Sequence, residues 1–318
     1  MNVSNRTIWQ LAGGPSTRPY ADVFLRYGVG LIGPGDAGVW KPGCDDNEFE
    51  GRFVRHFANE MKVGDIVLLR TGIATITAIG LVASDYLHLN QFDDVNGWDL
   101  QHARRIRWCK LPQEHTFNSS IFGANPPRLS RSNKNEIRDF AGKFVNSPPT
   151  RWQEMPLPDL PLEEPELNII PTHLKEIIAQ AHDLHGIYWD RNKAEHPTEG
   201  ELVAHFVVPF FRCLGWPPEL IAVKWRYIDV AIFTSLPRNP QNCRFVIEAK
   251  RLGAGVEVAL KQAKEYVKSL DSSMDIIVTD GLRYRLYSGE KDYKPITYAN
   301  LIRLKQSATK LFDQLKRL

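Results

Sequence analysis

Residues 227–233 read YIDVAIF and residues 245–250 read FVIEAK. Both runs are rich in β-branched and aromatic residues, which predicts two strands. Asp229 lies in the first apolar run, and Glu248 and Lys250 lie in the second. A carboxylate in a low dielectric must be paired, hydrogen-bonded or bound to metal. The three ionisable groups therefore indicate a shared site.

The spacing within these strands suggests a chemistry for that site. Side chains alternate along a strand, so Glu248 and Lys250 project to the same face while Ala249 faces the other way. If Asp229 comes from the neighbouring strand, two carboxylates can hold one divalent cation beside an ammonium. Oxygen ligands suit Mg²⁺ or Mn²⁺, which polarise a phosphate and acidify bound water. Lys250 can then orient or deprotonate the attacking water, which predicts phosphodiester hydrolysis.

The flanking sequence predicts an α/β domain around the two strands. Apolar residues at helical spacing predict three helices, at residues 172–185, 198–214 and 256–270. MDIIVTD and RYRLYS predict two more strands on either side of Gly281. AVKWRYIDVAIF and RFVIEAK are β-rich runs that the turn-like SLPRNPQN separates. This order of elements belongs to a mixed sheet flanked by helices.

Residues 196–290 resemble the PD-(D/E)xK nuclease superfamily, in particular the nuclease domain of type I restriction motor subunits and RecB-like nucleases. The likeness runs through HPTEGELVAHFVVPFFRCLGW, IDVAIF and VIEAKR, and Gln262 and Tyr266 look like the QxxxY motif of that subgroup. Ile228 replaces the proline of the family name, at a position that varies. The resemblance implies a restriction-endonuclease-like fold. The implied catalytic residues are Asp229, Glu248, Lys250, Glu199, Gln262 and Tyr266. The implied metal is Mg²⁺, with Mn²⁺ as a substitute, at Asp229, Glu248 and Ala249.

Two residues compete as the acid that this family places on its opening helix, Glu199 and Glu201. Helical periodicity counted back from Phe210 places Glu199 on the buried face and Glu201 on the opposite side. The family spacing, counted back from Pro209, also favours Glu199. The alternative for Glu199 is a first-turn carboxylate that complements the helix dipole after Thr198.

Residues 1–148 indicate a compact β-rich domain. The expected strands are IWQLAG, GVGLIG, GDIVLL, ITAIGLV and ARRIRWCK, and the expected helical segments are PYADVFLRY and FEGRFVRHFANEM. GDIVLL and the run that follows look like a hairpin over a barrel wall. The pattern resembles the PUA-like superfamily, especially EVE domains. That resemblance implies a β-barrel that binds modified bases or RNA.

Several polar and aromatic residues of this half are candidates for binding a modified base or nucleic acid. They are Trp9, Trp40, Trp98, Asp36, Arg104, Arg105 and Arg107. The tryptophans offer planes on which an extruded base could stack, and the arginines offer charge for the phosphates around it. The aspartate lies in a glycine-rich run and offers a hydrogen-bond acceptor. The alternative is that most of the aromatic residues fill the barrel core.

A proline-rich and acidic segment separates the halves. It reads SPPTRWQEMPLPDLPLEEPELNIIPT from Ser147 to Thr172. Proline fixes φ and removes a donor, so the segment is expected to be a semi-rigid spacer. The predicted organisation is a domain at residues 1–148, a linker at 149–171 and a nuclease domain at 172–318.

Composition limits the class of protein. The chain has 318 residues, 43% of them hydrophobic, and a net charge of +3, which is too small to indicate a nucleic-acid partner without clustering. No run of eighteen apolar residues occurs and the N-terminus lacks the layout of a signal peptide, so a cytoplasmic protein without a membrane partner is expected. The four cysteines form no CxxC pair, which disfavours a disulfide framework or a zinc knuckle.

The two halves together predict a modification-dependent DNA endonuclease of the restriction or phage-defence type. Its partner would be DNA that carries modified bases, and a homodimer would allow cleavage of both strands. One alternative is a regulatory protein that binds nucleic acid through a nuclease-like fold without cutting it. The other is a nuclease directed by RNA or by nucleic-acid structure.

Overall fold

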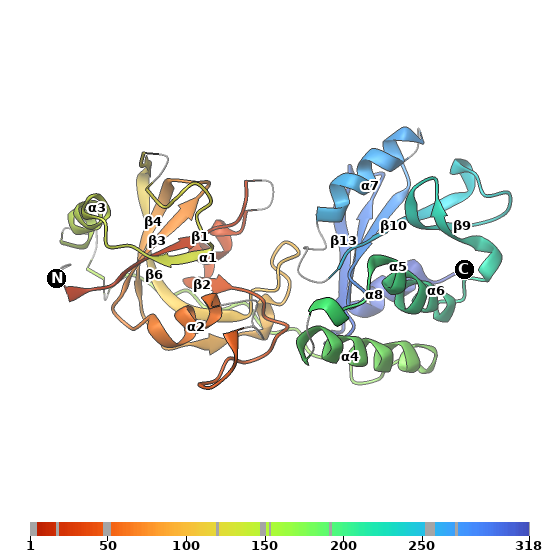
Figure 1. Ribbon diagram of the computed structural model, residues 1–318, viewed down its shortest axis with the longest axis horizontal. Coiled ribbons are helices and arrows are strands. Elements are labelled where there is room, and N and C mark those ends of the chain that lie inside the picture. The colour runs from red at the N-terminus through yellow and green to blue at the C-terminus, as the bar shows by residue number, and fades with distance from the viewer. Residues whose placement is uncertain are drawn as a thin grey trace. The chain divides into compact units, whose positions relative to one another are not determined.

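The chain forms two compact units, residues 1–163 and 164–318, in this computed structural model (Figure 1). The structure describes residues 5–16, 19–46, 52–118, 121–146, 151–152, 154–190, 193–251, 258–270 and 273–317. Unit 1 has two buried apolar clusters and unit 2 has one. Across these ranges, no helix is both long enough and apolar enough to cross a membrane.

Unit 1 is built on one sheet. Its strands are β1 (Ile8–Ala12), β2 (Val29–Ile32), β3 (Ile66–Thr71), β4 (Thr75–Val82), β5 (Leu87–His88), β6 (His102–Thr116) and β7 (Leu129–Arg131). The order is β2-β6-β4-β3-β1-β7, with β5 paired to β6. The expected β3–β4 hairpin is confirmed by its antiparallel register. No pairing joins β2 to β7 within the described ranges, so the sheet is a half-barrel, which confirms the β-rich unit and shows only part of the expected β-barrel.

Short helices cover the sheet of unit 1. They are α1 (Ala21–Tyr27), α2 (Phe53–Arg55), the π-helical turn η3 (His56–Glu60), the 3₁₀ turn η4 (Asn90–Phe92) and α3 (Asn135–Asn146). Gly28 ends α1 in the left-handed conformation, with φ of 59°, which glycine adopts without a steric penalty. Trp9, Phe24 and Phe57 are fully buried and fill the core between helices and sheet.

Residues of the proline-rich segment pack against the units, whereas its sequence predicts a semi-rigid spacer. Trp152 and Met155 are buried in an apolar cluster of unit 1, and the Arg107 guanidinium donates to the Met155 carbonyl. At the other end, the Glu164 carboxylate accepts hydrogen bonds from the backbone and hydroxyl of Ser307 in unit 2. The boundary therefore falls after residue 163.

Unit 2 is built on a six-stranded mixed sheet, as the sequence predicts. Its strands are β8 (Ile221–Trp225), β9 (Ile228–Phe233), β10 (Cys243–Ala249), β11 (Asp275–Thr279), β12 (Arg283–Ser288) and β13 (Lys294–Asn300). The order is β13-β12-β11-β10-β9-β8, and β10 and β11 are the parallel pair. A two-residue turn divides the β-rich run at residues 222–233 into the β8–β9 hairpin.

Helices lie on both faces of this sheet. They are η5 (Thr172–Leu174), α4 (Lys175–Asp190), η6 (Lys193–Glu195), α5 (Glu199–Leu202), η7 (Val203–Val207), α6 (Val208–Cys213), α7 (Val258–Ser269) and α8 (Ala308–Leu315), with single turns η8 (Pro218–Leu220) and η9 (Pro240–Asn242). Figure 1 shows α7 on one side of the sheet and α5, α6 and α8 on the other. The π-helical turn η7 lies just before Pro209, which has no N–H to donate to the preceding turn. Phe210 stacks on Tyr284 of the sheet, with ring centroids 4.3 Å apart.

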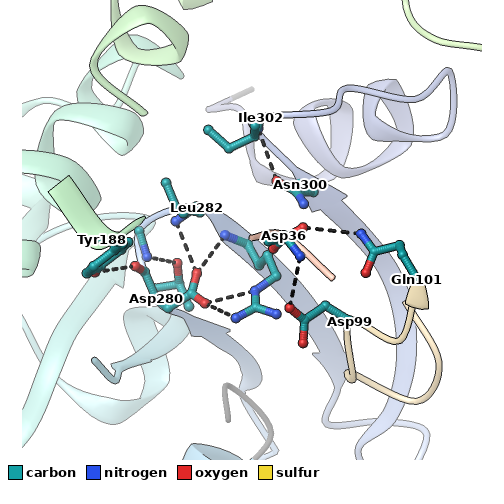
Figure 2. A network of polar contacts seen from close by, with 11 residues as sticks. Asp36, Asp99, Gln101, Tyr188, Asp280, Leu282, Asn300 and Ile302 are labelled. Carbon is teal, nitrogen blue, oxygen red and sulfur yellow. Dashed lines mark hydrogen bonds and ion pairs between the residues drawn. The ribbon is translucent and has the colours of Figure 1, made fainter. Parts of the chain in front are cut away.

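A buried ion pair fixes the turn between β11 and β12 (Figure 2). The Asp280 carboxylate is 1% exposed and accepts from Nε and Nη2 of Arg283 at 2.8 and 2.6 Å. It also accepts from the backbone N–H groups of Leu282 and Arg283 at 3.1 and 2.8 Å. The Tyr188 hydroxyl donates to the Asp280 carbonyl at 3.2 Å and ties the turn to α4.

Candidate functional site

Asp229 and Glu248 lie next to each other on the adjacent strands β9 and β10. The register pairs Val230 with Ile247, so Asp229 and Glu248 are opposite one another at the next position and share a face of the sheet. Both are buried, with 3% and 1% of their surfaces exposed. The backbone N–H of Ala249 donates to Asp229 Oδ2 at 2.9 Å, which fixes that carboxylate. Two acidic side chains that the sequence places 19 residues apart are thus brought together by the β9–β10 pairing.

Lys250 supplies the cation of this site. Its Nζ lies 2.9 Å from Glu248 Oε1 and 3.6 Å from Glu199 Oε2, and its backbone N–H donates to the Thr279 carbonyl at 2.9 Å. Burial lowers the pKa of Lys250, but the hydrogen bond that Lys250 donates to Glu248 and the charges of Glu248, Glu199 and Asp229 outweigh burial and leave the pKa raised. Lys250 is therefore an ammonium at neutral pH.

One carboxylate oxygen of Glu248 has no hydrogen-bond partner among the described residues. Burial raises the pKa of this carboxyl, and the hydrogen bond from Lys250 opposes that rise only in part. Lys250 occupies Oε1, whereas buried Oε2 has no hydrogen-bond partner within the described residues. An unpartnered buried acceptor beside a second carboxylate is an arrangement that a divalent cation would satisfy.

The geometry gives Glu199 and Glu201 different roles. The carboxylate of Glu201 accepts from the Thr198 backbone N–H at 2.7 Å, and the Thr198 hydroxyl accepts from the Glu201 N–H at 3.2 Å. These bonds form a capping box at the start of α5. Glu199 instead points its carboxylate to Lys250. Glu199 is thus the helical acid that meets the site, and Glu201 holds the helix end.

Lys224 on β8 is a site residue that the sequence reasoning missed. Its ammonium forms an ion pair with Asp229 Oδ1, although the lysine side chain is 62% exposed. The pKa of Lys224 is raised, first because of the hydrogen bond to Asp229. Recognition of the β8–β9 hairpin would have placed Lys224 opposite Asp229, but its turn, Arg226-Tyr227, lacks the usual Asn-Gly or Asp-Gly signal.

Gln262 and Tyr266 form a polar pair on α7. Gln262 Nε2 donates to the Tyr266 hydroxyl at 2.7 Å, one helical turn away. The Tyr266 ring packs against the core of unit 2, and α7 lies over β10 and β11. The pair is therefore held rigidly on the helix that covers the strand bearing Glu248. The structure brings these two residues to each other rather than to the carboxylates.

The donor set for a metal is small. Within the part of the chain that the structure describes, no group of three or more His, Cys, Asp or Glu side chains is placed to hold a metal ion. A cation at this site would rest on the carboxylates of Asp229 and Glu248 and on the backbone of Ala249, with Glu199 connected through Lys250.

In unit 1, four of the residues that are candidates for binding nucleic acid make contacts that stabilise the fold. Trp9 is fully buried, and its indole N–H donates to Asp65 Oδ2 at 2.9 Å. Arg104 is 2% exposed, and its guanidinium donates to carbonyls of three residues. The acceptors of Arg104 are Phe57, Ala58 and Ser84. Arg105 donates to Gly28 and Pro158, and Arg107 donates to Met155. In this arrangement the arginines satisfy backbone carbonyls, so their predicted role as phosphate contacts finds no geometric support.

The other three candidates, Asp36, Trp40 and Trp98, lie in or near a polar cluster around the loop at residues 33–40. The backbone N–H of Trp40 donates to the Tyr86 hydroxyl at 3.1 Å. That hydroxyl lies 2.8 Å from His102 Nδ1. His102 Nε2 lies 2.7 Å from the Pro34 carbonyl oxygen, so it carries the proton and the Tyr86 hydroxyl donates to Nδ1. Burial lowers the pKa of His102 to about 3. The imidazole is therefore neutral at physiological pH.

Asp36 is held in the same loop (Figure 2). Its backbone N–H donates to Asp99 Oδ2 at 3.3 Å, and Gln101 Nε2 donates to its Oδ1 at 3.4 Å. The Gln101 Oε1 and the Trp40 Nε1 are buried and lack hydrogen-bond partners among the residues described. Trp98 contacts the edge of Tyr20, with ring centroids 6.3 Å apart. The cluster therefore includes an acceptor, Gln101 Oε1, and a donor, Trp40 Nε1, that have no partner among the described residues.

Comparisons with known proteins identify one family model. Residues 40–125 match a domain of unknown function, DUF8426. The match covers the centre of unit 1, from Trp40 through β6, and no residue of unit 2. No curated protein matches the chain. No solved structure matches it either.

Proposed function

We propose that this protein is a metal-dependent endonuclease that cuts DNA at the site formed by Asp229, Glu248 and Lys250. The observation that carries the proposal is the pair of buried carboxylates on adjacent strands, with Lys250 Nζ 2.9 Å from Glu248 Oε1. The sequence resemblance to PD-(D/E)xK nucleases agrees with this arrangement. The family match in unit 1 carries no function.

The energetics of the site favour an enzyme over a protein that only binds nucleic acid. Two neighbouring buried carboxylates repel each other, and burial adds a desolvation penalty that raises the pKa of Glu248. They would also repel a polyanion. A protein that only grips phosphates gains nothing from this arrangement, whereas a phosphodiesterase that holds a cation there does.

Each residue would have a distinct role in cleavage. Asp229, Glu248 and the Ala249 backbone would hold Mg²⁺, which supplies charge to polarise the phosphate and acidify water when bound. Lys250 is charged, so it would orient the attacking water and stabilise charge that develops on the phosphate. Glu199 would hold the Lys250 ammonium in position from the side opposite Glu248. Gln262 and Tyr266 would line the rim from α7.

We propose that unit 1 recognises the DNA, through the loop at residues 33–40. The support is the buried donor at Trp40 Nε1 and the buried acceptor at Gln101 Oε1, because unpartnered polar atoms of this kind are positioned to read the edge of a base. Asp36 adds an acceptor in the same loop. A modified base extruded into this cluster would make the enzyme dependent on DNA modification.

A cleavage panel tests this function. Full-length protein is incubated with plain plasmid, with phage DNA that carries modified cytosine or adenine, and with RNA, each with Mg²⁺ or with EDTA. The expected result is Mg²⁺-dependent cutting of DNA with a preference for modified substrate. Binding of DNA without cutting under any metal condition would favour the regulatory alternative, and cutting of RNA alone would replace the substrate.

A further inference from the structure

The tip of the β8–β9 hairpin has a conformation that its residues disfavour. Trp225 pairs with Ile228, and the two-residue turn between them consists of Arg226 and Tyr227. Their φ angles are 49° and 71°, both in the left-handed region. Hairpin turns of this kind favour Asn-Gly or Asp-Gly, because in that region the Cβ atom of other residues comes too close to the following carbonyl oxygen. Folding alone therefore does not explain an arginine and a tyrosine at the tip.

The same two residues are exposed and chemically suited to a nucleic-acid strand. Tyr227 is 84% exposed, the second largest exposure among the described large hydrophobic side chains after Leu162. Arg226 is also exposed, and its guanidinium carbon lies 5.1 Å from the centroid of the Trp225 ring, which packs in turn against Phe233. An aromatic ring can stack on a base, and an arginine can contact a phosphate beside it.

The hairpin also lies beside the carboxylates. Val223 pairs with Val230, and Trp225 pairs with Ile228, so the position between these pairs brings Lys224 opposite Asp229. The Lys224 ammonium contacts Asp229 directly. Tyr227 is two residues from Asp229 along the chain. The hairpin tip with Arg226 and Tyr227 therefore lies within reach of a strand whose phosphate is bound at Asp229 and Glu248.

We propose that the β8–β9 hairpin grips the DNA strand next to the cleaved phosphate, with Tyr227 stacked on a base and Arg226 on a phosphate. This inference rests on the proposed nuclease function and names the part of unit 2 that binds its substrate. The disfavoured turn conformation places both residues at the exposed tip of the hairpin.

The test measures binding of labelled DNA to the full chain by fluorescence anisotropy in EDTA, where cleavage cannot contribute. Tyr227→Ala should weaken binding about tenfold or more, since a stacked base contributes on the order of 1–3 kcal/mol, and Tyr227→Phe should retain it. Arg226→Ala should weaken binding and reduce the slope of log affinity against log salt by about one. Lys291→Ala, which removes an exposed cation from the turn after β12, should change neither affinity nor slope.

The double variant Arg226→Asn with Tyr227→Gly separates a binding role from a structural one. It gives the turn its favoured residues, so the melting temperature should stay equal or rise while DNA binding falls. Wild-type affinity in this variant and in Tyr227→Ala would overturn the inference and leave the nuclease proposal intact. Failure of the wild-type chain to bind DNA would overturn both the hairpin inference and the nuclease proposal. Binding of RNA alone would overturn the inference that the bound strand is DNA.

Discussion

The carboxylate of Glu199 lies 3.6 Å from the Lys250 ammonium, although 51 positions separate the two residues in the sequence. Glu201, two residues further along α5, closes the capping box with Thr198 instead. Two acids in one helical turn therefore have different roles: Glu199 contacts the site and Glu201 caps the helix.

Substitutions at these positions should separate activity from stability. Glu199→Gln should slow DNA cleavage with little change in melting temperature, because it removes charge beside Lys250 and keeps the shape. Thr198→Ala should reduce stability by about 0.5–2 kcal/mol through the lost cap and affect cleavage less. Single-turnover kinetics give the cleavage rate of each variant, and thermal unfolding gives its stability. An equal effect of the two variants on cleavage would contradict the assignment of Glu199.

Removal of Asp280 should be among the most destabilising changes in unit 2. Asp280→Ala deletes both bonds to the buried Arg283 guanidinium and the acceptor for two backbone N–H groups. Breaking one partner of a buried pair costs about 3–5 kcal/mol. Asp313→Ala, which breaks an exposed pair with Lys316, is the control and should change stability by less than about 1 kcal/mol. Denaturant unfolding measures the free energy of unfolding of both variants. A decrease of less than about 1 kcal/mol for Asp280→Ala would refute the structural role of Asp280.

Acid should destabilise unit 1 through His102. Its pKa is lowered to about 3 in the folded state, chiefly by burial, whereas an unfolded histidine titrates near 6.5. Between these values the unfolded chain binds one more proton, so stability contributed by neutral His102 is present above pH 6.5 and is lost as pH falls. The expected slope is about 1.4 kcal/mol per pH unit. His102→Gln should flatten the profile of unfolding free energy between pH 6.5 and 5, and an unchanged slope would show that His102 is not the titrating group.

Proteolysis should cut at the boundary between the units rather than throughout the proline-rich segment. Leu162 is 96% exposed, whereas Trp152 and Met155 are buried in unit 1 and Glu164 is bonded to Ser307. Exposed backbone with few contacts is the preferred site of nicking. Low concentrations of a glutamate-specific protease should cut first after Glu163 and release two folded fragments. First cleavage after Glu154 would show that the segment is open, as its sequence alone suggests.

The sequence predicted the elements of unit 2 around the site because their signals are local. Alternation placed Glu248 and Lys250 on one face, and helical periodicity favoured Glu199. The capping-box pattern of Thr198 with Glu201 was also readable and would have settled the choice between the two acids. Lys224 was missed because its approach to Asp229 depends on a hairpin that has no Asn-Gly or Asp-Gly turn.

Some features of unit 1 could not be predicted from the sequence. A cluster such as Arg104 with Arg105 looks the same whether its guanidinium groups face phosphate or backbone carbonyls. Only the fold reveals that Arg104 is buried against Phe57 and Ala58. The half-barrel was equally hidden, because closure depends on long-range pairing between strand edges rather than on the pattern within any strand.

Mg²⁺-dependent cleavage of DNA by the wild-type chain, set beside Asp229→Asn and Lys250→Met, tests the central claim most directly. Phage DNA that carries modified bases and plain plasmid are the substrates, and EDTA replaces Mg²⁺ in the control. We expect cleavage by wild type in Mg²⁺ alone and a loss of about a hundredfold or more in each variant, with DNA binding retained. Cleavage by wild type that persists in EDTA, or near-wild-type turnover in either variant, would contradict the central claim.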